Sequence, residues 1–235
     1  MKIKDLQLLK IEKYLNNKKI ISSKLLSDSF GINCIKIATE DKKNYIIKYY
    51  KKNNYKFNAI KSEYENLNYL NGLNLKFFPI AYPADKDHLI ISFIENDKSQ
   101  PKESKDDFVN AIINMHSNKN DKFGFNFNTQ IGGLKQINIK TDNWIEFYKK
   151  NRLNYIYELI CSTNPMEKLI NSKIEKLLNK LEDFIPKNPI PTLLHGDLWE
   201  GNILFNKKKF VGLIDPGSFF GHNEFEIAYL TWFNP

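Results

Sequence analysis

The first third of the chain changes from helical to strand spacing. Apolar residues between positions 5 and 15 recur at roughly helical intervals, which predicts a helix there. Residues 34–39 and 44–50 are two runs rich in β-branched and aromatic side chains. Because the polar segment 40–43 separates the two runs, the pattern predicts a β-hairpin.

An amphipathic helix and one more strand complete this first part. Apolar residues fall at steps of three and four from Phe57 to Leu70, and the following Asn71-Gly72 pair supplies a stop signal. Residues 88–94 predict another strand. The predicted order β-β-α-β describes a small mixed lobe, which we place at residues 1–95.

The remaining residues, 96–235, predict a larger and mainly helical lobe. Helical spacing covers residues 108–116 and 142–160, and Pro165 is a suitable first residue for a third helix. The prolines between positions 186 and 191 end that helix. Short apolar strands and a last helix follow, at residues 192–194, 202–205 and 210–214 and from about Asn223 onward. The expected fold class is therefore α+β with two lobes.

Composition excludes several classes of protein. Of the 235 residues, 42% are hydrophobic and 14% are aromatic, which is enough for a core and excludes global disorder. No apolar run reaches the ~18 residues that a membrane span needs, and the charges that follow Met1 do not fit an export signal. The two cysteines, Cys34 and Cys161, lie far apart. They predict neither a disulfide framework nor a cysteine-based zinc site, and they fit a reducing cytoplasm.

Lysine dominates the charge of the chain. There are 35 basic and 27 acidic residues, a formal net charge of +8, and Arg152 is the single arginine. Nucleic-acid binders often use arginine for bidentate contacts to bases and phosphates. A lysine surplus spread along the whole chain therefore argues against a nucleic-acid partner. We interpret the lysines as a solvated surface, and the functional alternative is attraction of an anionic ligand such as a nucleotide.

Two carboxylates and an amide stand at positions that suit phosphoryl transfer. Asp197 lies on a polar loop after an apolar strand, Asn202 comes five residues later, and Asp215 ends the next predicted hairpin. Phosphoryl transfer needs a carboxylate that accepts a hydroxyl proton and oxygen ligands that hold Mg²⁺ against phosphates. The catalytic loop of protein kinases has the same Asp-to-Asn spacing, with a metal-binding Asp on the following turn.

The match is hard to obtain by chance. The fixed positions are His195, Gly196, Asp197, Gly201 and Asn202. With uniform composition, five such positions match in roughly one chain of this length in ten thousand. A polar loop whose Asp and Asn cap turns explains either residue alone. It does not explain the whole set together with Asp215.

The first lobe offers a lysine and a glutamate for a nucleotide. Lys48 lies in an otherwise apolar strand, where a lysine is unusual unless it is paired or at an edge. A kinase needs such a lysine on the α/β-phosphates and a helix glutamate that holds it. We favour Glu63 for that glutamate, with Glu65 as its rival. Residues 88–94 run into Glu95, where a kinase-like fold has the hinge to its second lobe.

The segment His195-Gly-Asp-Leu-Trp-Glu-Gly-Asn202 resembles the signature of the fructosamine-3-kinase (ketosamine-3-kinase) family, which belongs to the aminoglycoside-phosphotransferase-like group of protein-kinase-like folds. The Leu198-Trp199 pair separates that family from aminoglycoside and choline kinases. Other landmarks similar to those of the family stand in order over roughly residues 20 to 233: Phe123-Gly-Phe, Ile131-Gly-Gly, Gln136-Ile-Asn, Trp144-Ile-Glu-Phe, Arg152-Leu, Ile214-Asp-Pro and Phe220-Gly-His-Asn-Glu-Phe-Glu-Ile-Ala. The resemblance implies a bilobal protein-kinase-like fold.

The resemblance also implies a reaction. It is the ATP-dependent phosphorylation of the 3-hydroxyl of ketosamines (fructosamine, ribulosamine or erythrulosamine adducts of amines and protein lysines), which supports protein deglycation. Asp197 is the expected catalytic base, Asn202 and Asp215 are the expected Mg²⁺ ligands, and Lys48 is expected to bind the α/β-phosphates while Glu63 holds it. Further nucleotide contacts are expected from Gly31, Asn33 and Glu95, and substrate contacts from Trp199, Glu224 and His195.

Some of these residues also have a structural interpretation. Trp199 suits packing under the catalytic loop equally well, and His195 suits a loop-organising hydrogen bond better than proton transfer. Glu224 and Glu226 either bind the amine of the substrate or cap the last helix, and Glu226 stands where the family usually has Asp. For Arg152 we expect an acidic partner in the larger lobe.

Two features depart from the family pattern. The phosphate loop of the family has consecutive glycines, whereas residues 29–33 (Ser-Phe-Gly-Ile-Asn) hold only Gly31, so the backbone is expected to approach phosphates less closely. Cys34, the next residue, is interpreted as a buried and unreactive strand residue. Family members also continue with further helices beyond the position of Pro235. Either the sequence is incomplete or the protein is naturally short. A missing helical segment is expected to expose apolar surface in the larger lobe and to remove part of the substrate wall.

Three other functions stay open. The first is another small-molecule kinase, of the aminoglycoside, choline or homoserine type, against which Trp199 argues. The second is a non-catalytic nucleotide-binding protein or pseudokinase. The altered glycine loop favours it, and the intact Lys48, Asp197, Asn202 and Asp215 argue against it. The third is a basic nucleic-acid-binding module, which predicts arginine clusters and stacking aromatics that this sequence lacks.

Overall fold

The computed structural model describes residues 5–52, 55–97, 99 and 106–232 and divides the chain into two compact units. Unit 1 comprises residues 1–109, 132–134 and 201–216, and unit 2 comprises residues 110–131, 135–200 and 217–235. Each unit is therefore assembled from separate stretches of sequence. A single predicted lobe boundary at residue 95 does not account for residues 132–134 and 201–216, which belong to unit 1 although they lie later in the sequence. The boundary stays a prediction.

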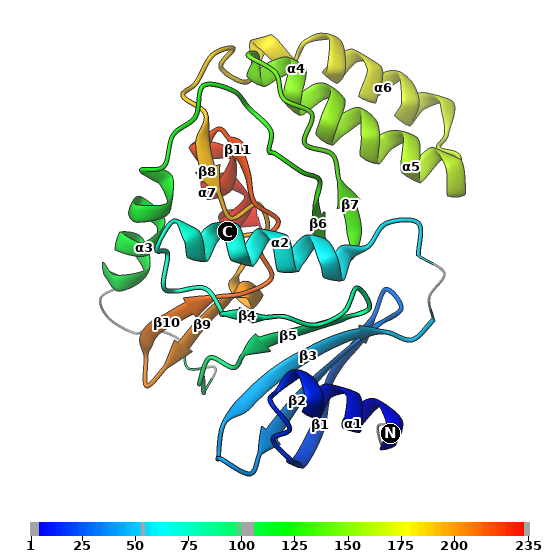
Figure 1. Ribbon diagram of the computed structural model, residues 1–235. Helices are drawn as coiled ribbons and strands as arrows, with labels where there is room; N and C mark the ends of the chain where they lie inside the picture. The colour runs from blue at the N-terminus through cyan, green and yellow to red at the C-terminus, as the bar shows by residue number, and fades with distance from the viewer. Residues whose placement is uncertain (1–4, 53–54, 98, 100–105, 233–235) are drawn as a thin grey trace. The chain divides into compact units, whose positions relative to one another are not determined.

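A five-stranded sheet forms the body of unit 1 (Figure 1). Its order is β1-β2-β3-β5-β4, and every neighbouring pair is antiparallel. The strands are β1 (Ile20–Ser29), β2 (Ile32–Thr39), β3 (Asn44–Tyr50), β4 (Ala81–Tyr82) and β5 (His88–Ser92). The hairpin predicted between residues 34 and 50 is confirmed, since β2 and β3 pair with Ile35 opposite Ile47.

Alternation of side chains along β3 gives this sheet two different faces. Tyr45, Ile47 and Tyr49 belong to one buried apolar cluster. Ile11 of α1 (Asp5–Tyr14) and Leu15, the residue after that helix, belong to the same cluster. The predicted helix at residues 5–15 is therefore present and covers this face of the sheet.

The opposite face of the sheet carries α2 (Ala59–Gly72). The helix begins after Asn58, whose side-chain oxygen accepts a hydrogen bond of 2.9 Å from the amide of Lys61. Leu67 and Leu70 are completely buried, as their spacing predicts. Because Lys48 lies between Ile47 and Tyr49 on β3, its side chain points to this α2 face.

Sequence periodicity does not predict β1 or β4. Nine of the ten residues of β1 are exposed, so no alternation of apolar and polar residues marks the strand. β1 is at the edge of the sheet, and β2 is its one neighbour among the described strands. β4 has only two residues, which is too short for a periodic signal.

A separate hairpin completes unit 1. β9 (Ile203–Asn206) and β10 (Lys209–Leu213) are antiparallel and agree with the strands predicted at residues 202–205 and 210–214. Lys207 and Lys208 join them, with φ angles of 49° and 64°. Two consecutive residues with positive φ are typical of the tight two-residue hairpin turn.

The second half of the chain contributes helices and two short two-stranded sheets, β6-β7 and β11-β8. The helices are α3 (Asp106–His116), α4 (Trp144–Tyr148), α5 (Tyr155–Thr163), α6 (Lys168–Asn179) and α7 (Asn223–Trp232). The strands are β6 (Thr129–Ile131), β7 (Leu134–Gln136), β8 (Thr192–Leu194) and β11 (Phe219–Gly221), and the shorter turns are η1 (Lys149–Asn154), η2 (Leu181–Asp183) and η3 (Glu200–Asn202).

The predicted helices are present with two differences. The stretch predicted at residues 142–160 is α4 and α5 joined by η1, a π-helical segment. Pro165 does not begin the third helix as predicted. The N-cap of α6 is Glu167, so the helix starts three residues after the proline.

Aromatic rings fill the core of unit 2: Phe123, Trp144, Phe147 and Phe219 are buried. The guanidinium carbon of Arg152 lies 4.7 Å from the ring centre of Phe147 and 4.1 Å from that of Phe219. Arg152 donates hydrogen bonds to the carbonyl of Ile137 at 2.5 Å and to Asn138 Oδ1 at 2.8 Å. Within the described residues Arg152 has no carboxylate partner, so the prediction of an acidic partner is wrong. Oxygen atoms of neutral groups accept from its two terminal nitrogens, whereas its Nε has no hydrogen-bond partner in this part of the chain.

α5 and α6 lie side by side (Figure 1), and Tyr157 donates a hydrogen bond of 2.8 Å to Asn171 Oδ1 between them. No residue of α5 is buried, and α6 buries only Leu178. Exposed apolar side chains on this helix pair are Ile156, Leu159, Ile160, Leu169, Ile170 and Leu177. Of the helices in the described part of the chain, none has the length and apolar character to cross a membrane.

Candidate active site

A charged cluster lies on the α2 face of the sheet in unit 1. Lys48 Nζ is 2.7 Å from Glu63 Oε1 and 2.5 Å from Asp215 Oδ1. The side chains of Lys48 and Glu63 are 12% and 4% exposed, whereas that of Asp215 is 40% exposed. The rival Glu65 instead lies 3.5 Å from Lys61, outside the cluster. The structure therefore brings Lys48, Glu63 and Asp215 together, although Asp215 is far from the other two in sequence.

Burial and charge oppose each other in this cluster. Burial acts to lower the pKa of Lys48, but the carboxylates of Asp215 and Glu63 outweigh it, so the pKa is raised and the ammonium stays charged. Burial raises the pKa of Glu63, and Asp215 adds to the rise against the attraction of Lys48. One lysine therefore compensates two carboxylates, and one of these is almost completely buried.

Asn66 makes a second link from α2 to the segment that contains Asp215. Its side-chain amide donates a hydrogen bond of 2.8 Å to the carbonyl of Pro216, and the residue is buried. Residues three apart share a helix face, so Glu63 and Asn66 act from the same side of α2. We did not predict Asn66 as a site residue. The sequence signal that could have identified Asn66 is its spacing of four residues from Leu70, which places a polar amide on the buried face of the predicted helix.

Asn202 and Asp215 lie at the open end of the β9–β10 hairpin. The amide of Ile214 donates a hydrogen bond of 3.0 Å to the carbonyl of Asn202, which extends the ladder beyond the Ile203–Leu213 pair. Asp215 has a φ of 56°, a left-handed conformation that is uncommon for a residue other than glycine. In the described ranges no group of three or more His, Cys, Asp or Glu side chains is arranged to hold a metal.

Gly31 lies in the two-residue turn between β1 and β2. Phe30 and Gly31 have φ angles of 50° and 75°, the left-handed backbone of a tight hairpin turn. Phe30 is exposed, and a Cβ at Gly133 would lie 2.9 Å from the Phe30 Cβ. A glycine at position 133 thus leaves room for the phenylalanine. Among the described residues other than its two chain neighbours, no atom lies within 4 Å of a Cβ built on Gly31, so this side of the turn is open there.

The side chain of Asn33 lies on the face of the sheet opposite Lys48. Asn33 pairs with Tyr49, and its amide donates a hydrogen bond of 3.1 Å to the Tyr49 hydroxyl. Tyr49 and Lys48 are consecutive on β3 and therefore point to opposite faces. The structure does not bring the Asn33 side chain to the Lys48 cluster.

Cys34 lies opposite Lys48 on the neighbouring strand. Burial raises the pKa of its thiol to about 11, against the attraction of the Lys48 ammonium. A thiol that keeps its proton at neutral pH is a poor nucleophile. This agrees with the interpretation of Cys34 as an unreactive strand residue. Cys34 is only half-buried, however, so the predicted full burial is wrong, and both Cys34 and Cys161 are free of disulfide bonds.

Glu95 follows β5 and connects it to two other strands. Its carboxylate accepts a hydrogen bond of 3.0 Å from the side chain of Asn44, at the start of β3. Its carbonyl accepts one of 3.3 Å from the side chain of Asn206, at the end of β9. These contacts hold the segment that we predict as the hinge.

The loop after β8 carries Asp197 in unit 2. His195 is buried, and its Nδ1 accepts a hydrogen bond of 3.2 Å from the Asp197 amide, while its carbonyl accepts one of 2.9 Å from Gly217. These contacts fit a loop-organising histidine. The half-buried Trp199 donates its amide to the Asp197 carbonyl at 3.2 Å. Tyr229 donates its hydroxyl to Asp197 Oδ1 at 2.9 Å, a contact that the motif does not predict.

The two glutamates of α7 differ in their surroundings. Glu226 is buried, and it accepts a hydrogen bond of 2.9 Å from the Gly196 amide while its other oxygen lies 2.7 Å from His116 Nε2. Glu226 therefore holds the loop and is not placed to receive the amine of a substrate. The Glu224 side chain is 80% exposed and lies 3.9 Å from His222 Nε2.

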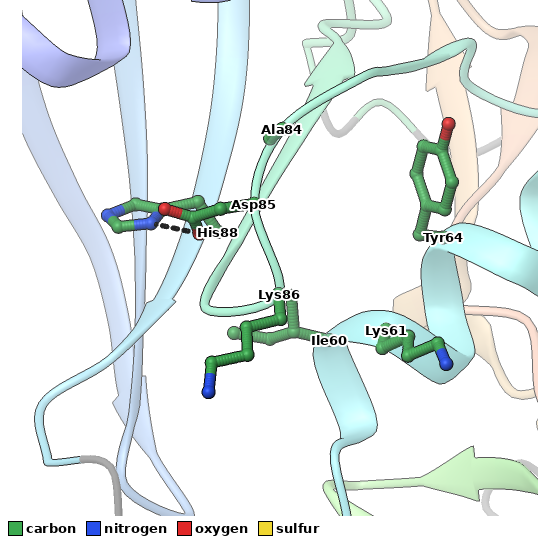
Figure 2. A pocket seen from close by; sticks show the side chains of 7 residues that line it. All are labelled: Ile60, Lys61, Tyr64, Ala84, Asp85, Lys86 and His88. Carbon is green, nitrogen blue, oxygen red and sulfur yellow. Dashed lines mark hydrogen bonds and ion pairs between the residues drawn. The ribbon is translucent and has the colours of Figure 1, made fainter.

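A small cavity of about 240 Å³ lies elsewhere in unit 1 (Figure 2). It is lined by Ile60, Lys61, Tyr64, Ala84, Asp85, Lys86 and His88. The Asp85 carboxylate is already engaged, since it lies 2.5 Å from Lys10 Nζ and 2.7 Å from His88 Nδ1 and accepts a hydrogen bond of 3.0 Å from the Tyr14 hydroxyl. No predicted site residue lines this cavity, so we do not assign it to the candidate active site.

Comparison with known proteins identifies the family. A family model described as fructosamine kinase matches residues 11–235. This chain belongs to the fructosamine kinase family. One relative of this fructosamine kinase family member is the chloroplastic protein-ribulosamine 3-kinase of rice (Oryza sativa subsp. japonica), 34% identical over 155 residues. The alignment covers 65% of this chain and 44% of the rice protein, so the chain spans less than half of that relative's length.

Solved structures resemble this fructosamine kinase family member in fold. A crystal structure from Thermobifida fusca, assigned as a fructosamine-3-kinase, has a TM-score of 0.80 at 21% identity and covers 94% of this chain and 77% of its own. An ADP-bound aminoglycoside phosphotransferase has a TM-score of 0.65 at 15% identity and covers 95% of this chain and 74% of its own. The predicted α+β, protein-kinase-like fold is confirmed. The catalytic and binding roles of the individual residues remain predictions.

Proposed function

We propose that this fructosamine kinase family member transfers the γ-phosphoryl group of ATP to the 3-hydroxyl of ketosamines. The observation that carries the proposal is the half-buried Lys48, which is paired with both Glu63 and Asp215. In kinases such a lysine–glutamate pair positions the α/β-phosphates, and the aspartate serves the metal. The name of the rice ribulosamine kinase supports this substrate class, and the ADP-bound relative supports ATP as the donor.

The proposed reaction uses the predicted residues in separate roles. Asp197 accepts the proton of the substrate 3-hydroxyl, and the hydroxyl oxygen attacks the γ-phosphorus. The bond from that phosphorus to the β–γ bridging oxygen breaks, and ADP leaves. Lys48 binds the α/β-phosphates. Glu224, with its exposed side chain, and Trp199 are better candidates for substrate contacts than His195, which is buried.

The donor set fits Mg²⁺ as the metal. Asn202 and Asp215 supply an amide oxygen and a carboxylate at the end of one hairpin. Mg²⁺ prefers oxygen ligands, takes one or two protein carboxylates, and completes its shell with phosphates and water. Bound there, it supplies charge neutralisation on the transferred phosphoryl group.

Gly31 and Glu95 belong to the same proposal as main-chain contacts to the nucleotide, at the open turn and at the predicted hinge. We expect the substrate to be either a small ketosamine or a protein-bound one, in a reducing cytoplasm, which the two free cysteines support.

Mass spectrometry of ribulose-lysine and fructose-lysine after incubation with the protein and Mg-ATP tests the proposal. We expect the addition of one phosphate, its loss in Asp197→Asn, and its retention in Asp142→Asn, an exposed aspartate that serves as the matched control. Phosphate transfer to an aminoglycoside and to neither ketosamine would move the protein to another class of small-molecule kinase. Absence of ATP binding would overturn the kinase proposal altogether.

A further inference from the structure

One hydrogen bond in unit 2 acts directly on the proposed base. The hydroxyl of Tyr229, on α7, donates to Asp197 Oδ1 at 2.9 Å. We propose that Tyr229 is a positioning residue that orients the Asp197 carboxylate toward the substrate hydroxyl. This inference rests on the proposed function, because it needs Asp197 as the base.

The direction of this hydrogen bond is fixed by chemistry. An ionised carboxylate only accepts hydrogen bonds, and a phenol that keeps its proton donates one. Burial, together with the charge of Asp197, raises the pKa of Tyr229, so the phenol stays protonated at neutral pH. The Tyr229 hydroxyl therefore remains a hydrogen-bond donor to Asp197 at neutral pH. By holding one oxygen it limits rotation of the carboxylate plane and so sets the direction of the remaining lone pairs.

A second contact from the same helix fixes the main chain beside Asp197. Glu226, three residues before Tyr229, accepts the amide hydrogen of Gly196 at 2.9 Å. Residues three apart share one helix face, and Gly196 and Asp197 are consecutive, so α7 holds two neighbouring residues of the loop. Glu226 fixes the backbone, whereas Tyr229 fixes the side chain that carries the chemistry.

The loop itself has little freedom to compensate. Gly196 has a φ of +83°, and a Cβ at this position would clash with the carbonyl oxygen of Gly217. The backbone before Asp197 is thus packed against a neighbouring strand connection. With the backbone held, the remaining freedom of Asp197 is the rotation of its side chain, which is the motion that Tyr229 restrains.

The hydrogen bond also has an electrostatic consequence. A donor to a carboxylate favours its ionised form, which is the form that accepts a proton. Without the phenol, the base becomes protonated at a higher pH. Loss of Tyr229 is therefore expected to move the acid limb of the pH–activity profile, an effect that loss of packing alone does not produce.

The variant Tyr229→Phe tests the inference because it keeps the ring and removes the hydroxyl. We expect kcat to fall about tenfold, which corresponds to ~1.4 kcal/mol, with the KM for ATP unchanged. We expect the acid limb of kcat/KM to shift to higher pH. Tyr148→Phe is the matched control, because the Tyr148 ring packs 5.5 Å from Phe225, which Tyr229 also contacts at 6.3 Å. Tyr148 has no carboxylate bonded to its phenol within the described residues.

Unfolding measurements keep this test independent of the substrate. In a double-mutant cycle, Tyr229→Phe should cost stability at pH 7 in the wild-type background and less in an Asp197→Ala background. Absence of that coupling would overturn the inference. An active wild type with unchanged Tyr229→Phe kinetics and pH profile would overturn it as well. A wild type that shows the coupling and phosphorylates no ketosamine would overturn the proposed function and leave the Tyr229–Asp197 bond standing.

Discussion

Lys48 is the residue whose loss should have the clearest pH dependence. The variant Lys48→Met keeps much of the side-chain length and leaves Glu63 buried without a cation. The pKa of Glu63 is already raised by burial, and the variant raises it further. The folded state of the variant then favours the protonated form of Glu63. The stability that this protonated form contributes is fully present below the ordinary pKa of a glutamate, and it is lost as the pH rises through the pKa of Glu63 in the folded state.

We therefore expect Lys48→Met to cost about 3 kcal/mol in the free energy of unfolding at pH 8 and clearly less at pH 5. Urea denaturation at the two pH values measures the difference. Lys61→Met is the control, because Lys61 is exposed and its ion pair with Glu65 spans 3.5 Å on the helix surface. Equal losses at both pH values would contradict the assigned role of Glu63.

Sequence alone reveals the residues whose signal is local. Lys48 interrupts an apolar strand, and the loop of Asp197 has a fixed spacing, so both are visible without a structure. Asn66 and Tyr229 contact partners 150 and 32 residues away, and no nearby pattern marks either contact. For Asn33 the sequence instead predicts a site residue whose side chain the structure does not bring to the Lys48 cluster. Its place in the motif is clear, but the strand register turns its side chain away from Lys48.

At the scale of elements, α6 separates a packed leucine from an unpacked neighbour. Leu178 is 9% exposed and Leu177 is 47% exposed. We expect Leu178→Ala to cost about 2–4 kcal/mol in the free energy of unfolding, because it leaves a cavity. Leu177→Ala should cost less than about 1 kcal/mol. Chemical denaturation of the two variants measures this contrast, and similar losses would mean that the exposed face of α6 is covered in solution.

Elements with one buried face follow from sequence, and those without one do not. α2 and the β2–β3 hairpin were predictable because their apolar residues keep a helical or strand period. β1 has no buried face to generate such a period. The π-helical η1 interrupts a helix that the apolar pattern alone presents as continuous, because spacing over a few residues does not distinguish the two kinds of turn.

At the scale of the whole molecule, nucleotide binding should raise the melting temperature. At a concentration of 100 times Kd, a ligand adds about 2.7 kcal/mol to the stability of the folded state. For a chain of this size, Mg-ATP should then raise Tm by roughly 5–11 °C. Differential scanning fluorimetry with Mg-ATP, and with ATP plus EDTA, measures the effect.

Removal of the metal should reduce that shift, and Asp215→Asn should reduce it to a similar degree if Asp215 is a Mg²⁺ ligand. Asp142→Asn, an exposed change, should keep the full shift. An equal shift with and without Mg²⁺ would contradict the role proposed for Asn202 and Asp215.

The general fold could be read from the sequence because the order of elements and the spacing of one loop are local properties. The division into units could not. Residues 132–134 and 201–216 return to unit 1 because of contacts made by folded segments, and contacts between distant segments leave no periodic trace in the chain.

The position of Arg152 gives the protein a natural chemical reporter. It is the single arginine in 235 residues, its guanidinium lies against two neighbouring aromatic rings, and its two terminal nitrogens donate to nearby oxygens. A reagent specific for arginine, such as phenylglyoxal, or a protease that cleaves only after arginine, therefore has one possible target, and ring contacts and hydrogen bonds hold that target in the folded state. The rate of this single reaction would report how often the core of unit 2 opens, without any label introduced into the chain.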